Sequence, residues 1–189
     1  QSYEHGVEDP PCLSGLGRME IHVTFEVAWG ILHYVALSGD DDFLLDEGLE
    51  TVLETTRFWA SRIRRDADGS YHLRGICGPD ELHKPVDDNA YMNQMIAELM
   101  RQADAAVDRC RALDAWRTDA LLHRLGVDDA ERRGWREITE RMHIPMLDER
   151  TMEQFDGHST LPIASPVAVK AEGMGADRIG KQADTTLLF

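Results

Sequence analysis

Apolar residues recur every three or four positions over much of this chain, which is the pattern of amphipathic helices. Between residues 18 and 37 the apolar series is Ile21, Phe25, Ala28, Leu32 and Val35. A second series runs from Leu45 to Ile63, after a polar turn at 38–41, and Asp42 is its expected cap. Because the turn is short, the two segments should form a helical hairpin.

Further helices are expected at about 86–112, 116–125 and 129–142, and a last helix should begin near Arg178. Pro85 would lie near the first turn of the 86–112 helix. Residues 1–17, 69–85 and 145–177 lack helical periodicity and indicate loops, with at most a short strand at 73–77. The pattern therefore predicts an all-α protein of helical hairpins, joined by long loops of the kind that often carry function.

Charge and composition exclude several classes of function. The chain has 35 acidic and 20 basic residues and a net charge of −15, so nucleic acid is not an expected partner. Its three cysteines are far apart, and no apolar run could cross a membrane, which predicts a cytoplasmic protein. The eight histidines are scattered without a metal-binding motif, and no nucleotide-binding motif occurs, so neither a metal nor a cofactor is expected.

The segment 75–93 holds the most informative polar residues. Asp80, Glu81 and His83 directly follow the stiff corner at Gly78-Pro79. A carboxylate held on such a corner is suited to proton transfer, because general acid catalysis depends first on fixed geometry. The alternative is that Asp80 and Glu81 cap a helix starting at Val86, and the residues alone leave both interpretations open.

The runs Gly78-Pro-Asp-Glu-Leu-His83 and Val86-Asp-Asp-Asn-Ala-Tyr-Met-Asn93 resemble the signature of glycoside hydrolase family 65. The segment 49–62, Ile144-Pro145, the run 153–157 and Lys181-Gln-Ala-Asp184 resemble the family in the same order. This family contains maltose, trehalose and kojibiose phosphorylases and some hydrolases. The resemblance implies an (α/α)6 toroid, with Glu81 as the general acid.

The resemblance also implies which residues bind the sugar. Lys181 and Gln182 match a pair that binds hydroxyls of the glycosyl unit. Asn89 and Asn93 stand four apart, so both amides could bind sugar hydroxyls from one helix face. His83 is expected to hydrogen-bond within its loop and is included among the expected sugar-binding residues.

The implied function is inverting cleavage of an α-glucosidic disaccharide, with phosphorolysis ranked first and inorganic phosphate as co-substrate. Two alternatives stay open: an inverting hydrolase whose base lies outside this chain, and a non-catalytic module that binds sugar or a partner chain. Asp88 and Met92 stand where the family usually has Asn and Thr, which bears on substrate preference.

The predicted helices number roughly six, about half of a twelve-helix toroid. Residues 1–189 are therefore expected to form a partial catalytic domain, incomplete at both ends. The expected partners are a small sugar and either further copies of the chain or the missing part of the domain.

Overall fold

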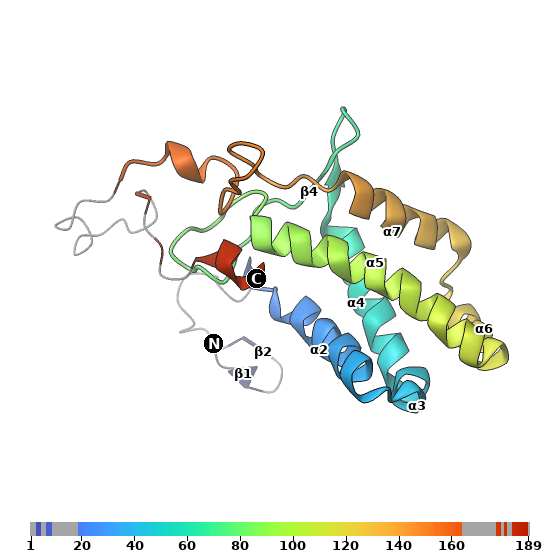
Figure 1. Cartoon of the computed structure of the whole chain (residues 1–189). Helices are drawn as coiled ribbons and strands as arrows, with labels where there is room; N and C mark the ends of the chain where they lie inside the picture. Colours follow the sequence, from blue (N-terminus) through green and yellow to red (C-terminus); the bar gives the residue numbers. More distant parts are fainter. Residues whose placement is uncertain are drawn as a thin grey trace. The chain divides into compact units, whose positions relative to one another are not determined.

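The computed structural model describes residues 3–4, 7–8, 19–163, 177–178, 180 and 183–188. The chain divides into two compact units. The helical unit contains Val23–Tyr71 and Gln94–Met142 (Figure 1). The loop unit contains Gln1–His22, His72–Asn93 and His143–Phe189. Each unit is described separately below.

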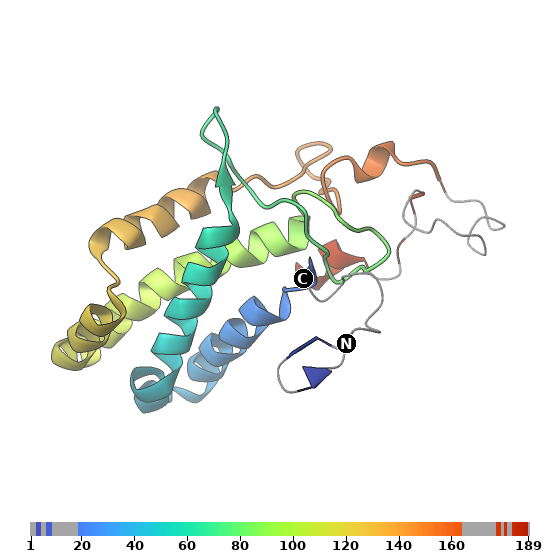
Figure 2. The same cartoon turned by 180° about the vertical axis from the view of Figure 1, so that it is seen from behind.

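The helical hairpin predicted near the start of the chain is confirmed. Helix α2 (Val23–Ser38) is followed by the short α3 (Asp41–Phe43), a π-helical turn η2 (Leu44–Gly48) and α4 (Leu49–Arg62). Figures 1 and 2 show from opposite sides that α2 and α4 meet at the α3 corner. The cap is Asp40 rather than the predicted Asp42: Asp40 Oδ1 accepts the Phe43 N–H at 3.0 Å.

Aromatic and aliphatic side chains of both helices form the core of this hairpin. Trp59 of α4 is completely buried, and its ring lies 5.5 Å from that of Phe25 on α2. Leu49, Val52 and Leu53 are buried along the same side of α4. Burial of these apolar surfaces is the main force that holds two such helices together.

Three more helices complete the list of long elements: α5 (Ala90–Leu113), α6 (Ala115–Leu125) and α7 (Asp129–Arg141). The predicted split between α6 and α7 is confirmed, because Gly126 ends α6 in a left-handed conformation with φ of 68°. The start predicted for α5 at Val86 is wrong, because the helix begins at Ala90. Pro85 accordingly lies in the preceding loop, after a cis peptide bond with Lys84.

Arg57 of α4 connects three helices of this unit. Its Nε lies 2.7 Å from Glu131 in the first turn of α7. Its two terminal nitrogens also donate to the carbonyl oxygens of Leu125 and Gly126 at the end of α6. These carbonyls have no partner inside their own helix. One guanidinium therefore satisfies the end of α6 and also pairs with a carboxylate in the first turn of α7.

Replacing Arg57 should therefore destabilise the helical unit more than an ordinary surface arginine would. We expect Arg57→Met to lower the free energy of unfolding by about 2–3 kcal/mol, since several charge-assisted hydrogen bonds are lost. The matched control is Arg124→Met, which breaks an exposed pair with Glu50 and should cost much less, because such a pair is screened by solvent. Chemical denaturation checks this, and equal losses in the two variants would contradict it.

The described residues of the loop unit contain little regular structure. β1 (Tyr3–Glu4) pairs with β2 (Val7–Glu8) inside a segment that was expected to be loop throughout. β3 (Arg64–Arg65) of the helical unit pairs with β4 (Tyr71–His72) at the boundary. Short 3-10 turns occur at His158–Thr160 (η3) and Asp184–Leu188 (η5). The last helix thus begins at Asp184 and not near Arg178, which instead bridges to Ile163.

Among the described residues, none of the helices is both long and apolar enough to span a bilayer.

Candidate active site

The segment between β4 and α5 forms a closed loop. Ile76 and Val86 bond to each other in both directions, at 3.0 and 2.8 Å, so the chain returns to its starting point. The Cys77 N–H adds a bond to the carbonyl oxygen of Met19 at 3.2 Å. The predicted corner at Gly78-Pro79 and the candidate acid Glu81 lie in the excursion between these anchors. We call residues 77–85 the acid loop.

Asp80 is buried at the corner of the acid loop, with 2% of its surface exposed. Its Oδ1 accepts the Leu82 N–H at 3.2 Å, and its Oδ2 accepts the Gln154 side-chain amide at 2.9 Å. Asp80 therefore stabilises the turn that carries Glu81 and ties it to the loop around Gln154.

Glu81 is half-buried in this turn. The alternative interpretation, that Asp80 and Glu81 cap the following helix, fails because Asn89 is the cap. The Met92 N–H donates to Asn89 Oδ1 at 3.1 Å, and α5 begins directly after Asn89. The role of Glu81 as an acid stays a prediction.

The thiol of Cys77 lies near several acidic residues, among them Glu20 and Glu81. Burial raises the pKa of Cys77 to about 11, and the charges of Glu20 and Glu81 act in the same direction. At neutral pH the sulfur therefore keeps its proton, and Cys77 is not a candidate nucleophile.

The carboxylate that organises the site is Asp184, which is completely buried. Asp184 Oδ1 accepts the backbone N–H of Asp80 at 2.8 Å, and Oδ2 accepts the side-chain amide of Asn89 at 2.7 Å. Asp184 belongs to the Lys181-Gln-Ala-Asp184 run, but sequence analysis assigned it no role. The family resemblance places the neighbouring Lys181 and Gln182 at the sugar site, but it does not indicate that Asp184 itself bonds to the acid loop.

Burial raises the pKa of Asp184 to about 6; the hydrogen bonds from Asn89 and Asp80 oppose the rise, and the charge of Asp80 adds to it. An aspartate in the unfolded chain titrates near 3.9, so the folded state holds this proton more tightly. The contribution of Asp184 to stability is then complete below about pH 4 and is lost as pH rises through 6, by about 2–3 kcal/mol.

We therefore expect the Asp184 carboxyl to titrate close to pH 6 when followed by ¹³C NMR of the side chain. Between pH 4 and 7 the wild-type protein should lose stability relative to Asp184→Asn, whose side chain does not titrate. A carboxyl midpoint near 4 would contradict the expectation.

The hydrogen bond between Asn89 and Asp184 lies so close to the backbone of residue 78 that only glycine leaves room for it. A Cβ at this position would lie closer than 3.0 Å to both Asn89 Nδ2 and Asp184 Oδ2. Any larger residue would push these two groups apart.

Gly78→Ala should consequently destabilise the protein by about 1–3 kcal/mol through overpacking. Gly30→Ala is the matched control, because no atom lies within 4 Å of its added Cβ. Gly30 lies inside α2, so its replacement should be neutral or stabilise by about 0.5–1 kcal/mol. Thermal unfolding of the two variants measures both effects, and a Gly78→Ala variant as stable as the wild type would contradict this account.

His83 is buried in the acid loop and makes contacts within the protein. Its Nε2 donates to the carbonyl oxygen of Asp177 at 3.0 Å, and its Nδ1 lies 3.6 Å from Asp80 Oδ2. The rings of Phe155 and His158 lie 5.0 and 5.6 Å from the His83 ring. The hydrogen bond of His83 thus leaves the acid loop, whereas a bond within the loop was predicted. Within the loop its ring only approaches Asp80, and direct contact with sugar stays a prediction.

Asn89 and Asn93 also direct their amide groups to protein acceptors. Besides the Asp184 bond of Asn89, Asn93 Nδ2 donates to Asp88 Oδ1 at 2.9 Å and to the carbonyl oxygen of His143 at 2.8 Å. Both side chains are buried, at 1% and 0% exposure. In this arrangement they stabilise the loop, and their predicted contact with sugar hydroxyls is untested.

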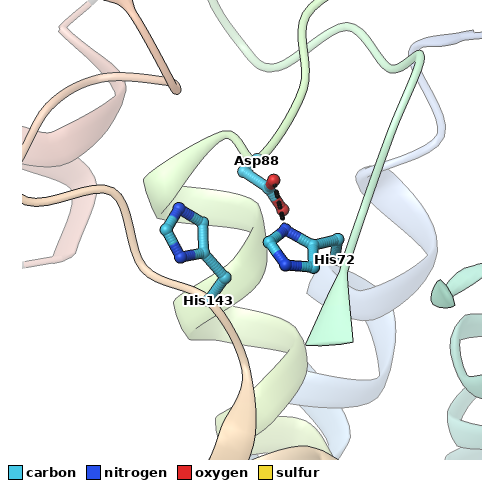
Figure 3. Close-up of side chains that lie close together, drawn as sticks. All are labelled: His72, Asp88 and His143. Atoms are coloured by element: carbon cyan, nitrogen blue, oxygen red, sulfur yellow. Dashed lines mark hydrogen bonds and ion pairs between the residues drawn. The ribbon is translucent and has the colours of Figure 1, made fainter. Parts of the chain in front are cut away.

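A cluster of His72, Asp88 and His143 was not foreseen from the sequence (Figure 3). His72 Nδ1 lies 2.8 Å from Asp88 Oδ2, and the two imidazole rings stack at 4.9 Å. One potential ligand atom from each residue lies within 4.8 Å of the others. Two imidazoles and a carboxylate are a donor set that suits zinc.

The bonding of Asp88 points to a structural role for this cluster. Its Oδ1 already accepts the Leu73 N–H at 3.0 Å and the amide of Asn93, while Oδ2 faces His72. Asp88 is 2% exposed. We interpret the cluster as a structural link in which a hydrogen bond joins His72 to Asp88 and ring stacking joins His72 to His143.

Lys181 and Gln182, the predicted sugar-binding pair, lie outside the described residues. Within the described part of the helical unit, a surface pocket of about 310 Å³ is formed by η2, α4 and α6. None of the predicted site residues lines this pocket, and its arginines pair with its own acidic residues.

Comparison with known proteins decides the family. The model of the glycosyl hydrolase family 65 central catalytic domain matches residues 12–186. The chain belongs to glycosyl hydrolase family 65. The resemblance recognised from the acid loop and the later matching segments is thereby confirmed.

Two curated relatives show how family 65 proteins cover this chain. A kojibiose phosphorylase from Caldanaerobacter subterraneus is 29% identical over 188 residues, which are 92% of this chain and 24% of the relative. A 1,2-α-glucosylglycerol phosphorylase from Bacillus selenitireducens is 32% identical over 149 residues, 78% of this chain and 19% of the relative. The chain thus spans about a quarter of the length of the first of these proteins and a fifth of the second.

A solved structure shares the fold. A putative kojibiose phosphorylase from the human microbiome superimposes with a TM-score of 0.76 at 24% identity, over 87% of this chain and 26% of that chain. At this identity the likeness concerns the fold alone. It confirms the predicted fold class, a helical segment of the family 65 (α/α)6 toroid.

Proposed function

We propose that this chain is part of an enzyme that cleaves an α-glucosidic disaccharide by phosphorolysis with inversion, and that Glu81 is its general acid. Membership of family 65 carries this proposal, together with relatives named as phosphorylases of kojibiose and of 1,2-α-glucosylglycerol. The site supports it through Glu81, which is half-buried in a loop held by bonds on both sides.

In the proposed reaction, an oxygen of inorganic phosphate attacks the anomeric carbon from the face opposite the glycosidic bond. The bond between this carbon and the glycosidic oxygen breaks, and Glu81 donates its proton to the departing oxygen. The acceptor sugar leaves with a hydroxyl group, and the α-glucoside becomes a β-sugar phosphate. Because phosphate is itself the nucleophile, this step needs no protein base.

Further parts of the proposal extend beyond the described residues. We propose that Lys181 and Gln182 bind hydroxyls of the glycosyl unit, and that residues 1–189 supply part of an (α/α)6 catalytic domain. Phosphate is the co-substrate, and a cytoplasmic location remains our prediction.

The decisive experiment is Glu81→Gln in the full protein, assayed on two substrates that differ in their leaving group. On a natural disaccharide the variant should lose about 10²- to 10⁴-fold in kcat, because the poor leaving group needs the proton. On a nitrophenyl α-glucoside, whose leaving group departs without protonation, the loss should be below about 10-fold.

The exposed Glu149→Gln in the same unit is the matched control and should change neither rate. Normal turnover of the disaccharide by Glu81→Gln would overturn the assignment of Glu81. The same assay separates the alternatives: phosphate-independent release of glucose would indicate a hydrolase, and sugar binding without turnover by the wild type would indicate a non-catalytic module.

A further inference from the structure

The buried Asp184 carboxylate joins the two ends of the segment that carries Glu81. One oxygen accepts the N–H of Asp80, the residue directly before Glu81, and the other accepts the side chain of Asn89, the cap of α5. Residues 80 and 89 are thereby held to one group that is itself 0% exposed. Water cannot replace either donor at such a site without a large rearrangement.

The backbone at Glu81 has a hydrogen-bonded amide on each side. The Asp80 N–H points to Asp184, and the Leu82 N–H returns to Asp80 Oδ1. These bonds hold the backbone before and after Glu81 and so restrict the direction in which its side chain leaves the chain. Of these two bonds, only the one that Asp80 donates to Asp184 connects the turn to a distant part of the chain.

The connection at Asn89 adds a second fixed point. Asn89 caps α5 through its Oδ1 and reaches Asp184 through its Nδ2, so both polar atoms of one side chain are used. The Asp184 carboxylate thus connects the Glu81 turn to the start of the long helix α5. A helix terminus is rigid, so it holds a connected catalytic group in a fixed position.

We propose that Asp184 is a positioning residue for Glu81: its two hydrogen bonds hold the acid loop against the start of α5 so that the Glu81 carboxyl is aimed at the glycosidic oxygen. This inference rests on the proposed function of Glu81. Asp184 does not touch the substrate; it acts through the backbone of the acid loop.

The test is Asp184→Asn in the full protein. An asparagine has one acceptor oxygen, so its amide group must face either the Asp80 N–H or the Asn89 amide, and one bond becomes a repulsive donor pair. A displacement of about 1 Å at a catalytic group can cost about 10²-fold in rate. We expect kcat/KM to fall about 10- to 100-fold on the natural disaccharide and by less than about 3-fold on the nitrophenyl α-glucoside.

Two further variants keep the outcome interpretable. Asn89→Ser retains a good helix cap but cannot reach Asp184 with an amide donor, so it should show the same dependence on the leaving group with a smaller loss. Asp104→Asn weakens a part-buried link to Arg132 and Arg136 in the helical unit. It should lower stability while leaving the ratio of the two substrate rates unchanged.

Equal losses on both substrates, or no loss, in Asp184→Asn would overturn the inference. If that variant does not fold, the ratio measured for Asn89→Ser decides. Glu81→Gln, run in parallel, separates this inference from the proposed function. If Glu81→Gln shows no dependence on the leaving group, the proposed function fails and this inference with it. If Glu81→Gln shows the dependence and the other two variants do not, only the role of Asp184 fails.

Discussion

A carboxylate removed from water must keep its hydrogen-bond donors, and this constraint at Asp184 organises the loop unit. The donors come from the backbone of Asp80, inside the acid loop, and from the side chain of Asn89, which follows the loop and caps α5. If either donor moved away, the buried Asp184 carboxyl would lose a hydrogen bond and would have to stay charged without it or take up a proton. The neighbouring residues fit this arrangement. Gly78 leaves room for the contact between Asn89 and Asp184, and the side-chain amide of Gln154 donates to the Asp80 carboxylate. A loop without regular secondary structure thus has a defined conformation.

In the helical unit the shared groups are cations, where in the loop unit the shared group is a carboxylate. Basic residues are fewer than acidic ones in this chain, whose net charge is −15. Two arginines of the helical unit each serve several acceptors. Arg57 bonds to Glu131 and to two carbonyls at the end of α6. Arg132, which is 4% exposed, bonds to Asp104 and Asp108. Each of these two guanidiniums thus pairs with more than one acceptor, while other acidic residues of the unit, such as Asp46 and Glu50, pair with exposed arginines.

Local patterns in the sequence predicted the parts of the structure that depend on local interactions. The apolar periodicity located α2, α4, α6 and α7, and the stop at Gly126 was correct, because helix burial and glycine caps act over a few residues. The start of α5 was placed too early because the apolar series continues into Val86, whose backbone is instead held by Ile76. The family signature located the acid loop. Neither Asp184 nor the cluster of His72, Asp88 and His143 could be found, since their partners are brought together only by tertiary folding.

Three consecutive residues before α5 have partners in three different places. Asp87 bonds through its side chain to the Gly75 N–H and through its carbonyl oxygen to the Asp156 N–H. Asp88, in a left-handed conformation with φ of 51°, turns its carboxylate to Leu73 and His72. Asn89 faces Asp184. Adding or removing one residue here would rotate every later side chain away from its partner, so during divergence this stretch can exchange side chains but cannot change its length.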